Sequence, residues 1–294
     1  MTLHDLVERG RARLERAGIA PEEARLDAEV LARHVLGWDR AAYVARRHER
    51  ASGGFVSRYD TVLVRRETRE PVSLITGIRE FWGLELEVTP AVLTPRPETE
   101  LIIEEALAAW AGRPDPARVI DVGTGTGCLA IALAREFASA RIVAVDVSGA
   151  ALDVARRNAR RHGVADRISF VQADLLTGVR GHADLIVSNP PYVPRVTTPP
   201  LPPEVRDHEP AIALFGGEDG LDPMRQLVTQ AASRLRPGGL LIAEFGLDQE
   251  AGVRQRLASP AGWTIVKVRR DLQAIPRVVV ARREPAERGD RDAE

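Results

Sequence analysis

At residues 119–127 the chain reads Val119-Ile120-Asp121-Val122-Gly123-Thr124-Gly125-Thr126-Gly127. The apolar residues before the glycines predict a buried strand, and residues 128–134 after them have the apolar spacing of a helix. Glycines allow positive φ and let a ligand approach the backbone closely. A strand, a tight turn and a helix in this order are typical of sites for nucleotide-like cofactors.

Two further predicted strands end near a carboxylate. Residues 140–146 end in Asp146, which we expect to accept hydrogen bonds from ribose hydroxyls. Residues 168–174 end in Asp174, which is placed to accept the exocyclic amine of adenine while Leu175 lines the ring. A cap on the following turn is an equally simple role for Asp174.

The charge at the glycine turn narrows the choice of cofactor. By itself such a turn suits a dinucleotide dehydrogenase equally well. However, its spacing is Gly-x-Gly-x-Gly, not the Gly-x-Gly-x-x-Gly that seats a pyrophosphate at a helix N-terminus. Asp121 stands just before the glycines, where its negative charge would oppose a phosphate. We therefore predict a cofactor that is positively charged there, and S-adenosylmethionine, with its sulfonium and ammonium groups, meets that demand.

A second motif, Asn189-Pro190-Pro191-Tyr192, follows the apolar run 184–187 and so stands where another buried strand ends. Proline has no N–H and a restricted φ, so nearby carbonyls stay free to accept hydrogen bonds from an NH2 group. We interpret the motif as a rigid tip that holds a planar amino group, with Tyr192 as an aromatic wall. For two prolines alone, a rigid turn after a strand is the simpler interpretation.

The order of predicted elements indicates an α/β fold with a doubly wound, mostly parallel sheet and a small N-terminal helical domain. Residues 1–70 have helical apolar spacing without a strand-like run, and residues 71–94 alternate like a hairpin-like linker. Residues 95–283 form the second domain, and the charged stretch 284–294 is expected to be disordered. Within the second domain we expect helices at 98–110, 128–137, 150–162 and 222–235, and late strands at 239–244, 263–268 and 277–281.

These motifs together resemble the class I S-adenosylmethionine-dependent methyltransferases, and within them the protein-(glutamine-N5) methyltransferases that modify peptide-chain release factors. The resemblance covers most of the chain, and its Pro-Arg-Pro-x-Thr-Glu element discriminates better than the Asn-Pro-Pro-Tyr tip, which base-methylating enzymes share. Further segments that carry it are Pro71-Val72-Ser73-Leu74-Ile75-Thr76-Gly77, Phe81-Trp82-Gly83-Leu84, Pro95-Arg96-Pro97-Glu98-Thr99-Glu100, Leu214-Phe215-Gly216-Gly217-Glu218-Asp219-Gly220-Leu221, and Glu244-Phe245-Gly246 with Gln249.

The resemblance implies a role for each motif. Catalysis falls to Asn189, Pro190 and Tyr192, which with Pro191 also clamp the substrate amide. The Asn189 side-chain oxygen and the Pro190 carbonyl would accept the two hydrogens of a glutamine amide and aim its nitrogen at the methyl group, while Tyr192 packs on the glutamine stem. Cofactor binding falls to Asp121, Gly123, Thr124, Gly125, Thr126, Gly127, Asp146, Asp174, Leu175 and Asn189.

The resemblance implies less specific roles for two other parts of the chain. By analogy Glu98, Thr99 and Glu100 border the methionine end of the cofactor, although acids in the first turn of a helix explain them as simply. The helical domain is expected to read the protein partner, a release factor that presents its glutamine on a Gly-Gly-Gln loop. A single glutamine supplies too little binding energy for selectivity by itself.

Composition bounds the remaining possibilities. The 294 residues carry a formal net charge of −1, so no overall field draws the chain to nucleic acid. Cys128 is the sole cysteine, which excludes an intrachain disulfide and favours a reducing cytoplasm. The start of the chain lacks the pattern of a secretory signal, and no apolar run reaches the ~18 residues of a membrane span. The six histidines are scattered and predict no metal site.

Three other functions stay open at this point. A glutamine of a ribosomal protein would need the same chemistry. An amino methyltransferase for DNA or RNA bases would share the glycine turn and the Asn-Pro-Pro-Tyr tip, but should bring a basic surface, and acids are mixed throughout residues 1–70. A nucleotide-binding oxidoreductase or an inactive scaffold is disfavoured by the phosphate argument and by the intact acceptor tip.

Overall fold

The structure, a computed structural model, describes residues 1–258 and 262–285. Most of the predicted tail 284–294 therefore lies outside the described residues. The chain divides into two compact units, one of residues 1–78 together with 202–208, the other of residues 79–201 together with the chain from Glu209 onward. The short helix α9 (Pro203–Arg206) thus belongs to the helical unit, although the sequence on either side of it belongs to the other unit.

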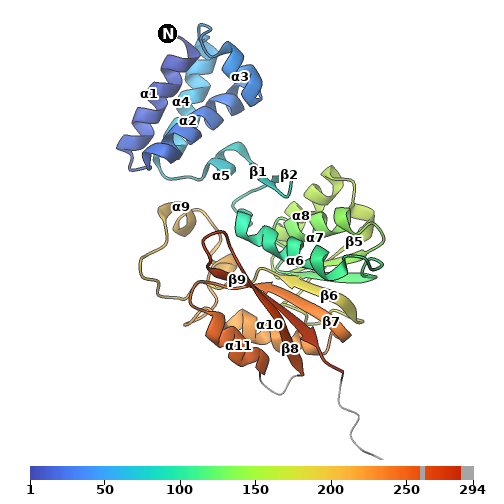
Figure 1. Cartoon of the computed structure of the whole chain (residues 1–294). Helices are drawn as coiled ribbons and strands as arrows, with labels where there is room; N and C mark the ends of the chain where they lie inside the picture. Colours follow the sequence, from blue (N-terminus) through green and yellow to red (C-terminus); the bar gives the residue numbers. More distant parts are fainter. Residues whose placement is uncertain (259–261, 286–294) are drawn as a thin grey trace, which may run out of the picture. The chain divides into compact units, whose positions relative to one another are not determined.

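The helical unit contains α1 (Leu3–Arg16), α2 (Pro21–Leu36), α3 (Arg40–Arg46), α4 (Gly53–Glu67) and α5 (Val72–Thr76) (Figure 1). Local signals set the helix ends: Thr2 and Asp5 form a reciprocal capping box at α1, and Pro21 opens α2. The apolar faces pack around a core that includes Leu14, Leu31 and Phe55. The helix α5 was not expected, because the sequence suggested only a linker there.

A buried arginine holds α2, α4 and α9 together within this unit. The Arg66 side chain is 1% exposed, and it donates to Asp27 Oδ2 at 2.7 Å, Glu23 Oε1 at 2.9 Å and Glu204 Oε1 at 2.9 Å. Glu204, on α9, also pairs with Arg69 at 2.7 Å. Removing one partner of a buried ion pair leaves an uncompensated buried charge, which is strongly destabilising.

We therefore expect Arg66→Met to lower the local stability of α2 and α4 by ~3–5 kcal/mol, because Asp27 loses its cation. Native-state hydrogen exchange of the α2 and α4 amides measures this directly. The matched control is Arg25→Met, because Arg25 is exposed and forms a loose ion pair, with 3.7 Å between its Nη2 and Glu22 Oε2. This substitution should change the stability by no more than about 1 kcal/mol. Equal protection in the two variants would contradict the role of Arg66.

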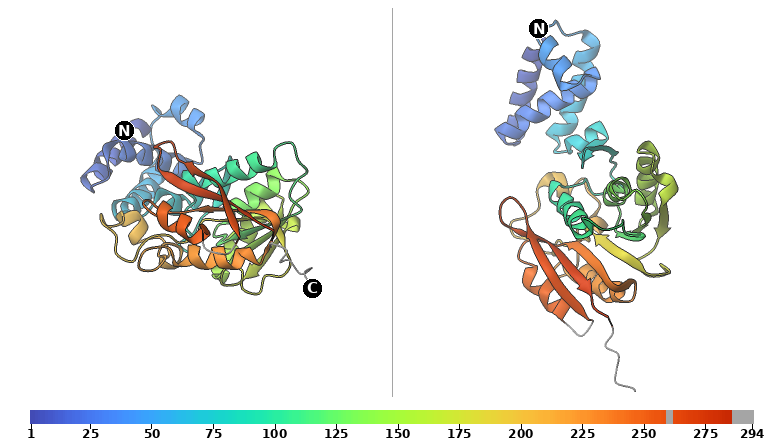
Figure 2. Two further views of the ribbon diagram at one scale, coloured as in Figure 1. Left: turned by 60° about the horizontal axis from the view of Figure 1, so that its bottom comes forward. Right: turned by 45° about the vertical axis from the view of Figure 1, so that its right-hand side comes forward.

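The second unit is built on a seven-stranded sheet in the order β5-β4-β3-β6-β7-β9-β8. Five consecutive strands pair in parallel with one another: β3 (Arg118–Val122), β4 (Arg141–Asp146), β5 (Ile168–Gln172), β6 (Ala183–Ser188) and β7 (Leu235–Glu244). The last two strands lie at one end of the sheet (Figure 2), where β9 (Pro276–Arg283) pairs antiparallel with both β7 and the edge strand β8 (Trp263–Arg270). The predicted mostly parallel α/β sheet is confirmed.

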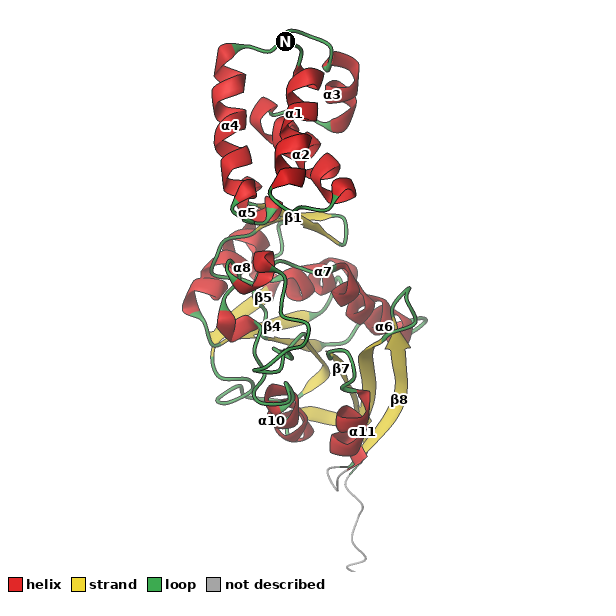
Figure 3. Cartoon of the chain, turned by 90° about the vertical axis from the view of Figure 1, so that its left-hand side faces the viewer, coloured by secondary structure: helices red, strands yellow, loops and turns green. Residues whose placement is uncertain are grey.

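Helices cover both faces of this sheet (Figures 1 and 3). One face packs against α6 (Glu100–Trp110), α7 (Cys128–Glu136) and α8 (Gly149–Arg161), and the other packs against α10 (Asp222–Ala232) and α11 (Glu250–Ala258). Neighbouring residues of one strand serve opposite faces, as Val119 and Ile120 do. Both faces are buried, so these strands are nearly continuous apolar runs, as expected of parallel sheets.

Several expected boundaries differ from the structure. The helix expected at 222–235 ends at Ala232, and Leu235 instead begins β7, where it pairs with Ala183 across an irregular register. Its apolar side chain fits either assignment, because periodicity cannot separate a helix end from the start of a buried strand. The strand β5 ends two residues before Asp174. The predicted hairpin is present as β1 (Ile78–Phe81) and β2 (Leu84–Glu87).

The remaining short elements are η1 (Pro97–Thr99), η2 (Ala165–Arg167) and η3 (Ala211–Ala213), each a single 3₁₀ turn. The first of them precedes α6 and carries Glu98 and Thr99. Within the described ranges, none of the helices combines the length and apolar character that a bilayer crossing requires.

Candidate active site

The sheet order brings the two sequence motifs together. The glycine turn follows β3 and the Asn-Pro-Pro-Tyr tip follows β6, and these strands are parallel neighbours paired from Val119–Leu185 to Val122–Ser188. The chain leaves β3 toward β4 on one side and enters β6 on the other, so the crevice beyond their carboxyl ends is a topological switch point, where open α/β sheets bind ligands.

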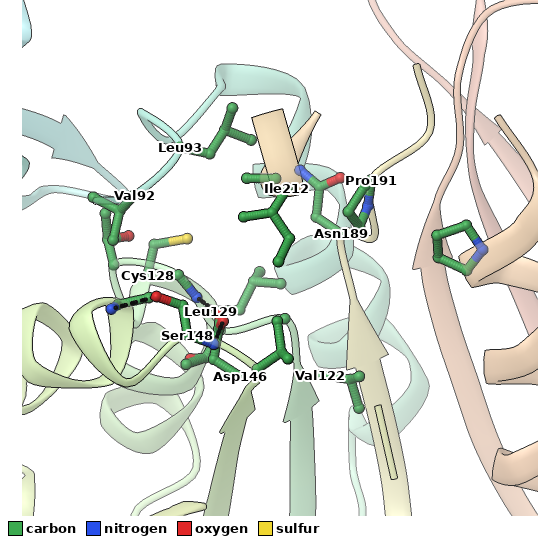
Figure 4. A pocket seen from close by; sticks show the side chains of 18 of the residues that line it. Val92, Leu93, Val122, Cys128, Leu129, Asp146, Ser148, Asn189, Pro191 and Ile212 are labelled. Carbon is green, nitrogen blue, oxygen red and sulfur yellow. Dashed lines mark hydrogen bonds between the residues drawn. The ribbon is translucent and has the colours of Figure 1, made fainter. Parts of the chain in front are cut away.

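A cavity of about 430 Å³ opens at this place, within the usual range of small-molecule sites. Its lining combines the glycine turn with apolar side chains such as Val92, Leu93 and Leu129. Figure 4 shows side chains from separate segments around it, among them Asp146, Asn189 and Ile212. The predicted site residues that line it are Gly123, Thr124, Gly125, Thr126, Asp146, Asp174, Leu175, Asn189 and Pro191.

Four predicted site residues do not line the cavity: Asp121, Gly127, Pro190 and Tyr192. Asp121 lies beneath the turn, where its Oδ2 accepts from Thr124 Oγ1 at 2.6 Å and from the Ala130 N–H at 3.1 Å. It therefore joins the glycine turn to the first turn of α7. Tyr192 does not present itself as a wall of the cavity; its hydroxyl donates to Glu244 Oε1 at 3.0 Å.

The carboxylates around the glycine turn make its surroundings suitable for a cation. Asp121 is fully buried, and burial raises the pKa of its carboxyl to about 7. Its Oδ1 is buried and has no hydrogen-bond partner among residues 1–258 and 262–285. Burial also raises the pKa of Asp146, whose Oδ2 accepts from the Gly125 N–H and Oδ1 from the Ser148 N–H, both at 2.9 Å. A phosphate would be repelled here, whereas a cationic ligand would relieve the buried charge.

Asn189 is held by a hydrogen-bonded chain that the sequence did not reveal. Its Nδ2 donates to Thr99 Oγ1 at 3.0 Å, and Thr99 Oγ1 donates to Glu244 Oε2 at 2.7 Å. Thr99 lines the cavity and is 2% exposed, while Glu244 at the end of β7 is 1% exposed. Of the three residues 98–100 that the resemblance assigned to the cofactor, Thr99 lines the cavity. Glu100 does not line it, and its carboxylate accepts from the Trp82 N–H at 2.9 Å.

A glycine-rich loop supports the backbone of the Asn-Pro-Pro-Tyr tip. A Cβ on Gly216 would lie 2.5 Å from the Pro191 carbonyl oxygen, and a Cβ on Gly220 would collide with the Tyr192 carbonyl oxygen. Gln249 links the loop to the tip, because its Nε2 donates to the Tyr192 carbonyl at 2.8 Å and to the Asp219 carbonyl at 3.1 Å. Segment 214–221, known from the resemblance only as a motif, therefore has a physical role.

Gly220→Ala is expected to displace the Tyr192 carbonyl and so lower both kcat, by ~10-fold or more, and stability, by about 1–3 kcal/mol. Gly220 has φ +76°, so part of the stability loss is backbone strain. Gly163→Ala separates the two effects, since Gly163 has φ +68° and, in the described part of the chain, no atom beyond its chain neighbours lies within 4 Å of an added Cβ. Steady-state kinetics and melting temperatures should show a fall in kcat for Gly220→Ala alone; a parallel fall in both variants would refute the steric role.

The fold and this cavity define a methyltransferase of the Rossmann-like class. Residues 99–199 match the family described as Methyltransferase small domain, and residues 5–77 match the PrmC N-terminal domain. The fold resembles that of a methyltransferase from Pyrococcus furiosus, at 21% identity and TM-score 0.52 over 70% of this chain and 91% of that one.

Two curated relatives narrow the class of methyltransferase to a family. The chain is 42% identical to the release factor glutamine methyltransferase of Bradyrhizobium diazoefficiens, over 93% of this chain and 92% of that protein. It is also 42% identical to the protein of the same name in Deinococcus radiodurans, over 96% and 99% of the two chains. The chain belongs to the family of release factor glutamine methyltransferases.

Proposed function

We propose that this protein methylates the side-chain amide nitrogen N5 of a glutamine in a peptide chain release factor, with S-adenosylmethionine as the methyl donor. The observation that carries the proposal is the position of Asn189: it lies on the cavity wall beside the glycine turn, its nitrogen is held by Thr99, and no described residue donates to its Oδ1. That oxygen is left to accept a hydrogen from an incoming amide.

The donor-binding residues follow from the chemistry of the cavity. When bound, S-adenosylmethionine supplies an electrophilic methyl group. Asp146 has lone pairs left to accept ribose hydroxyls, Asp174 and Leu175 would hold the adenine, and the buried charge of Asp121 would favour the cationic end. The backbone of Gly123 and Gly125 lets the donor approach closely, because neither residue has a side chain in the way.

The acceptor amide needs to be oriented, because its nitrogen lone pair is delocalised into the carbonyl. Asn189 Oδ1 and the Pro190 carbonyl would accept its two hydrogens and hold the nitrogen toward the methyl group. Correct positioning of two reacting groups supplies up to ~7–11 kcal/mol of the barrier. The same oxygens stabilise the positive charge that develops on the nitrogen. In this proposal Pro191, which lines the cavity, belongs to the clamp for the substrate amide, while Tyr192 supports the tip through its hydrogen bond to Glu244.

The helical unit is the part that we propose reads the release factor, through a docking surface larger than one side chain. The test uses labelled donor with purified release factor, ribosomal protein and nucleic acid in parallel. We expect label on the glutamine of the Gly-Gly-Gln loop, located by mass spectrometry of peptides. Label confined to ribosomal protein would move the substrate to that partner, and label on nucleic acid alone would overturn the glutamine assignment.

A further inference from the structure

Glu244 is a buried carboxylate that the proposed chemistry does not use. It stands at the end of β7, one strand away from the Asn-Pro-Pro-Tyr tip in the sheet order, and is 1% exposed. Both of its oxygens accept hydrogen bonds, Oε2 from Thr99 Oγ1 at 2.7 Å and Oε1 from Tyr192 OH at 3.0 Å. Burying a carboxylate is costly, so a buried acid that accepts from Thr99 and Tyr192 is expected to have a role other than filling space.

Proton counting along this chain of hydrogen bonds fixes the direction of each one. An ionised carboxylate can only accept, and a threonine hydroxyl has a single proton. Thr99 must therefore donate its hydroxyl proton to Glu244, so Thr99 Oγ1 can act only as an acceptor toward Asn189. The end of the Asn189 carboxamide that meets Thr99, at 3.0 Å, then has to be the nitrogen.

The orientation of this carboxamide matters because its two ends have opposite character. With Nδ2 on Thr99, the acceptor Oδ1 is left for the substrate. If the group were turned over, an NH2 would face the hydrogens of the glutamine amide and could not accept them. Nothing in the shape of an asparagine distinguishes the two states, since oxygen and nitrogen are nearly equal in size, so only the hydrogen-bond network selects one of them.

We propose that Glu244 is a positioning residue that acts through Thr99 to keep the acceptor oxygen of the Asn189 carboxamide toward the substrate glutamine. The inference rests on the proposed function, because it takes Asn189 as the acceptor for the substrate amide. The Tyr192 hydroxyl donates to the other oxygen of the same carboxylate. Glu244 is therefore connected to both ends of the tip, to Asn189 through Thr99 and to Tyr192 directly.

The protonation of Glu244 gives this device a pH dependence. A protonated Glu244 can donate to Thr99, which releases the Thr99 proton toward Asn189 and permits the inverted carboxamide. Burial, together with the charge of Glu98 on η1, raises the pKa of Glu244 to about 7, although the hydrogen bonds from Thr99 and Tyr192 and the charge of Arg277 on β9 act to lower it. Burial and the nearby charges of Asp121 and Glu244 raise the pKa of the Cys128 thiol on α7. Because the ionised form is the competent one, activity should be present above this pKa and lost as the pH falls through it.

The decisive comparison is Thr99→Val with Thr99→Ser. Valine keeps the shape of threonine but has no hydroxyl to donate to Glu244 and accept from Asn189, whereas serine keeps the hydroxyl. We expect Thr99→Val to lower kcat for glutamine methylation by ~10- to 100-fold, with donor binding measured by calorimetry little changed, and Thr99→Ser to recover most of the loss. A kcat for Thr99→Val equal to that of the wild type would overturn the proposal, as would an equal loss in Thr99→Ser.

The pH profile of kcat/KM supplies a readout that a merely structural role would not move. Burial raises the pKa of Asp121 to about 7 as well, so the profile is taken for the release factor with the donor saturating, where Asp121 is already paired with the donor's cationic end. Under these conditions the wild type should show an acid limb that titrates Glu244. Thr99→Val should lack this limb, because Glu244 no longer controls Asn189; an unchanged limb in Thr99→Val contradicts the proposal. Glu244→Gln should likewise lower kcat and lose the limb, since a glutamine can present either oxygen or nitrogen to Thr99.

The outcomes for this inference and for the proposed function separate cleanly. If the wild type places no methyl group on a glutamine, the proposed function fails. If the wild type methylates glutamine but the Thr99 pair and the acid limb behave otherwise than stated, only the role of Glu244 fails. Circular dichroism melts of all variants establish that each comparison is made between folded proteins.

Discussion

Replacing Asn189 with alanine is expected to lower kcat for glutamine methylation by ~10²–10³-fold, the usual effect of removing one preorganised hydrogen-bond partner of the reacting group. Binding of the donor should be little changed, because the donor contacts proposed here are made mainly by the glycine turn, Asp146 and Asp174. Single-turnover methylation of the release factor gives the rate of the chemical step, and calorimetry gives the donor affinity. The combination of lost turnover and retained donor binding is the specific signature.

Asn158 provides a contrast of the same residue type in the same unit. It is fully buried, its Oδ1 accepts from the Glu87 N–H at 2.7 Å, and its Nδ2 donates to the carbonyls of Glu87 and Thr126 at 3.0 Å. Asn158→Ala should therefore act mainly on stability, by about 1–3 kcal/mol for the groups left unpaired. An Asn189→Ala enzyme with unchanged kcat, or one whose loss of kcat merely follows a loss of folding as in Asn158→Ala, would refute the assignment of Asn189.

The parts of the site that the sequence predicted are those set by local pattern. Gly123 and Asn189 each end an apolar run, so their strands were recognisable, and parallel strands place their carboxyl ends at one edge of a sheet. Asp146 followed from the same pattern. The structure brings these residues to one cavity because β3, β4 and β6 are consecutive in the sheet order.

The parts that the sequence did not predict depend on pairings between distant segments. Thr99 and Glu244 are separated by 145 positions and meet only because η1 and the end of β7 flank the same crevice. Each had a simpler local explanation, Thr99 as part of an acidic helix start and Glu244 as the last residue of a strand. Tyr192 shows the same limit: the pattern identified an aromatic residue at the tip, but the direction of its hydroxyl depends on Glu244.

The second large effect is expected for Asp146→Asn, which should weaken donor binding by about 1.5–3 kcal/mol, or roughly 10- to 150-fold in the dissociation constant. The carboxylate already accepts from the Gly125 and Ser148 N–H groups, each at 2.9 Å, and only a carboxylate can accept from these and from ribose hydroxyls as well. In an asparagine one of the two carboxylate oxygens is replaced by an NH2 group, which would face a backbone N–H as a second donor. Asp153→Asn, on the exposed surface of α8, is the matched control and should leave the affinity unchanged.

A donor analogue without the ribose hydroxyls separates the ribose contact from the support of the turn. The wild type should bind this analogue more weakly than the parent compound, because Asp146 loses its ligand partners. Asp146→Asn should bind the two compounds with nearly equal affinity, since the discriminating carboxylate is gone. If Asp146→Asn still prefers the parent compound as strongly as the wild type does, then Asp146 holds the turn through Gly125 and Ser148 but does not read the ribose.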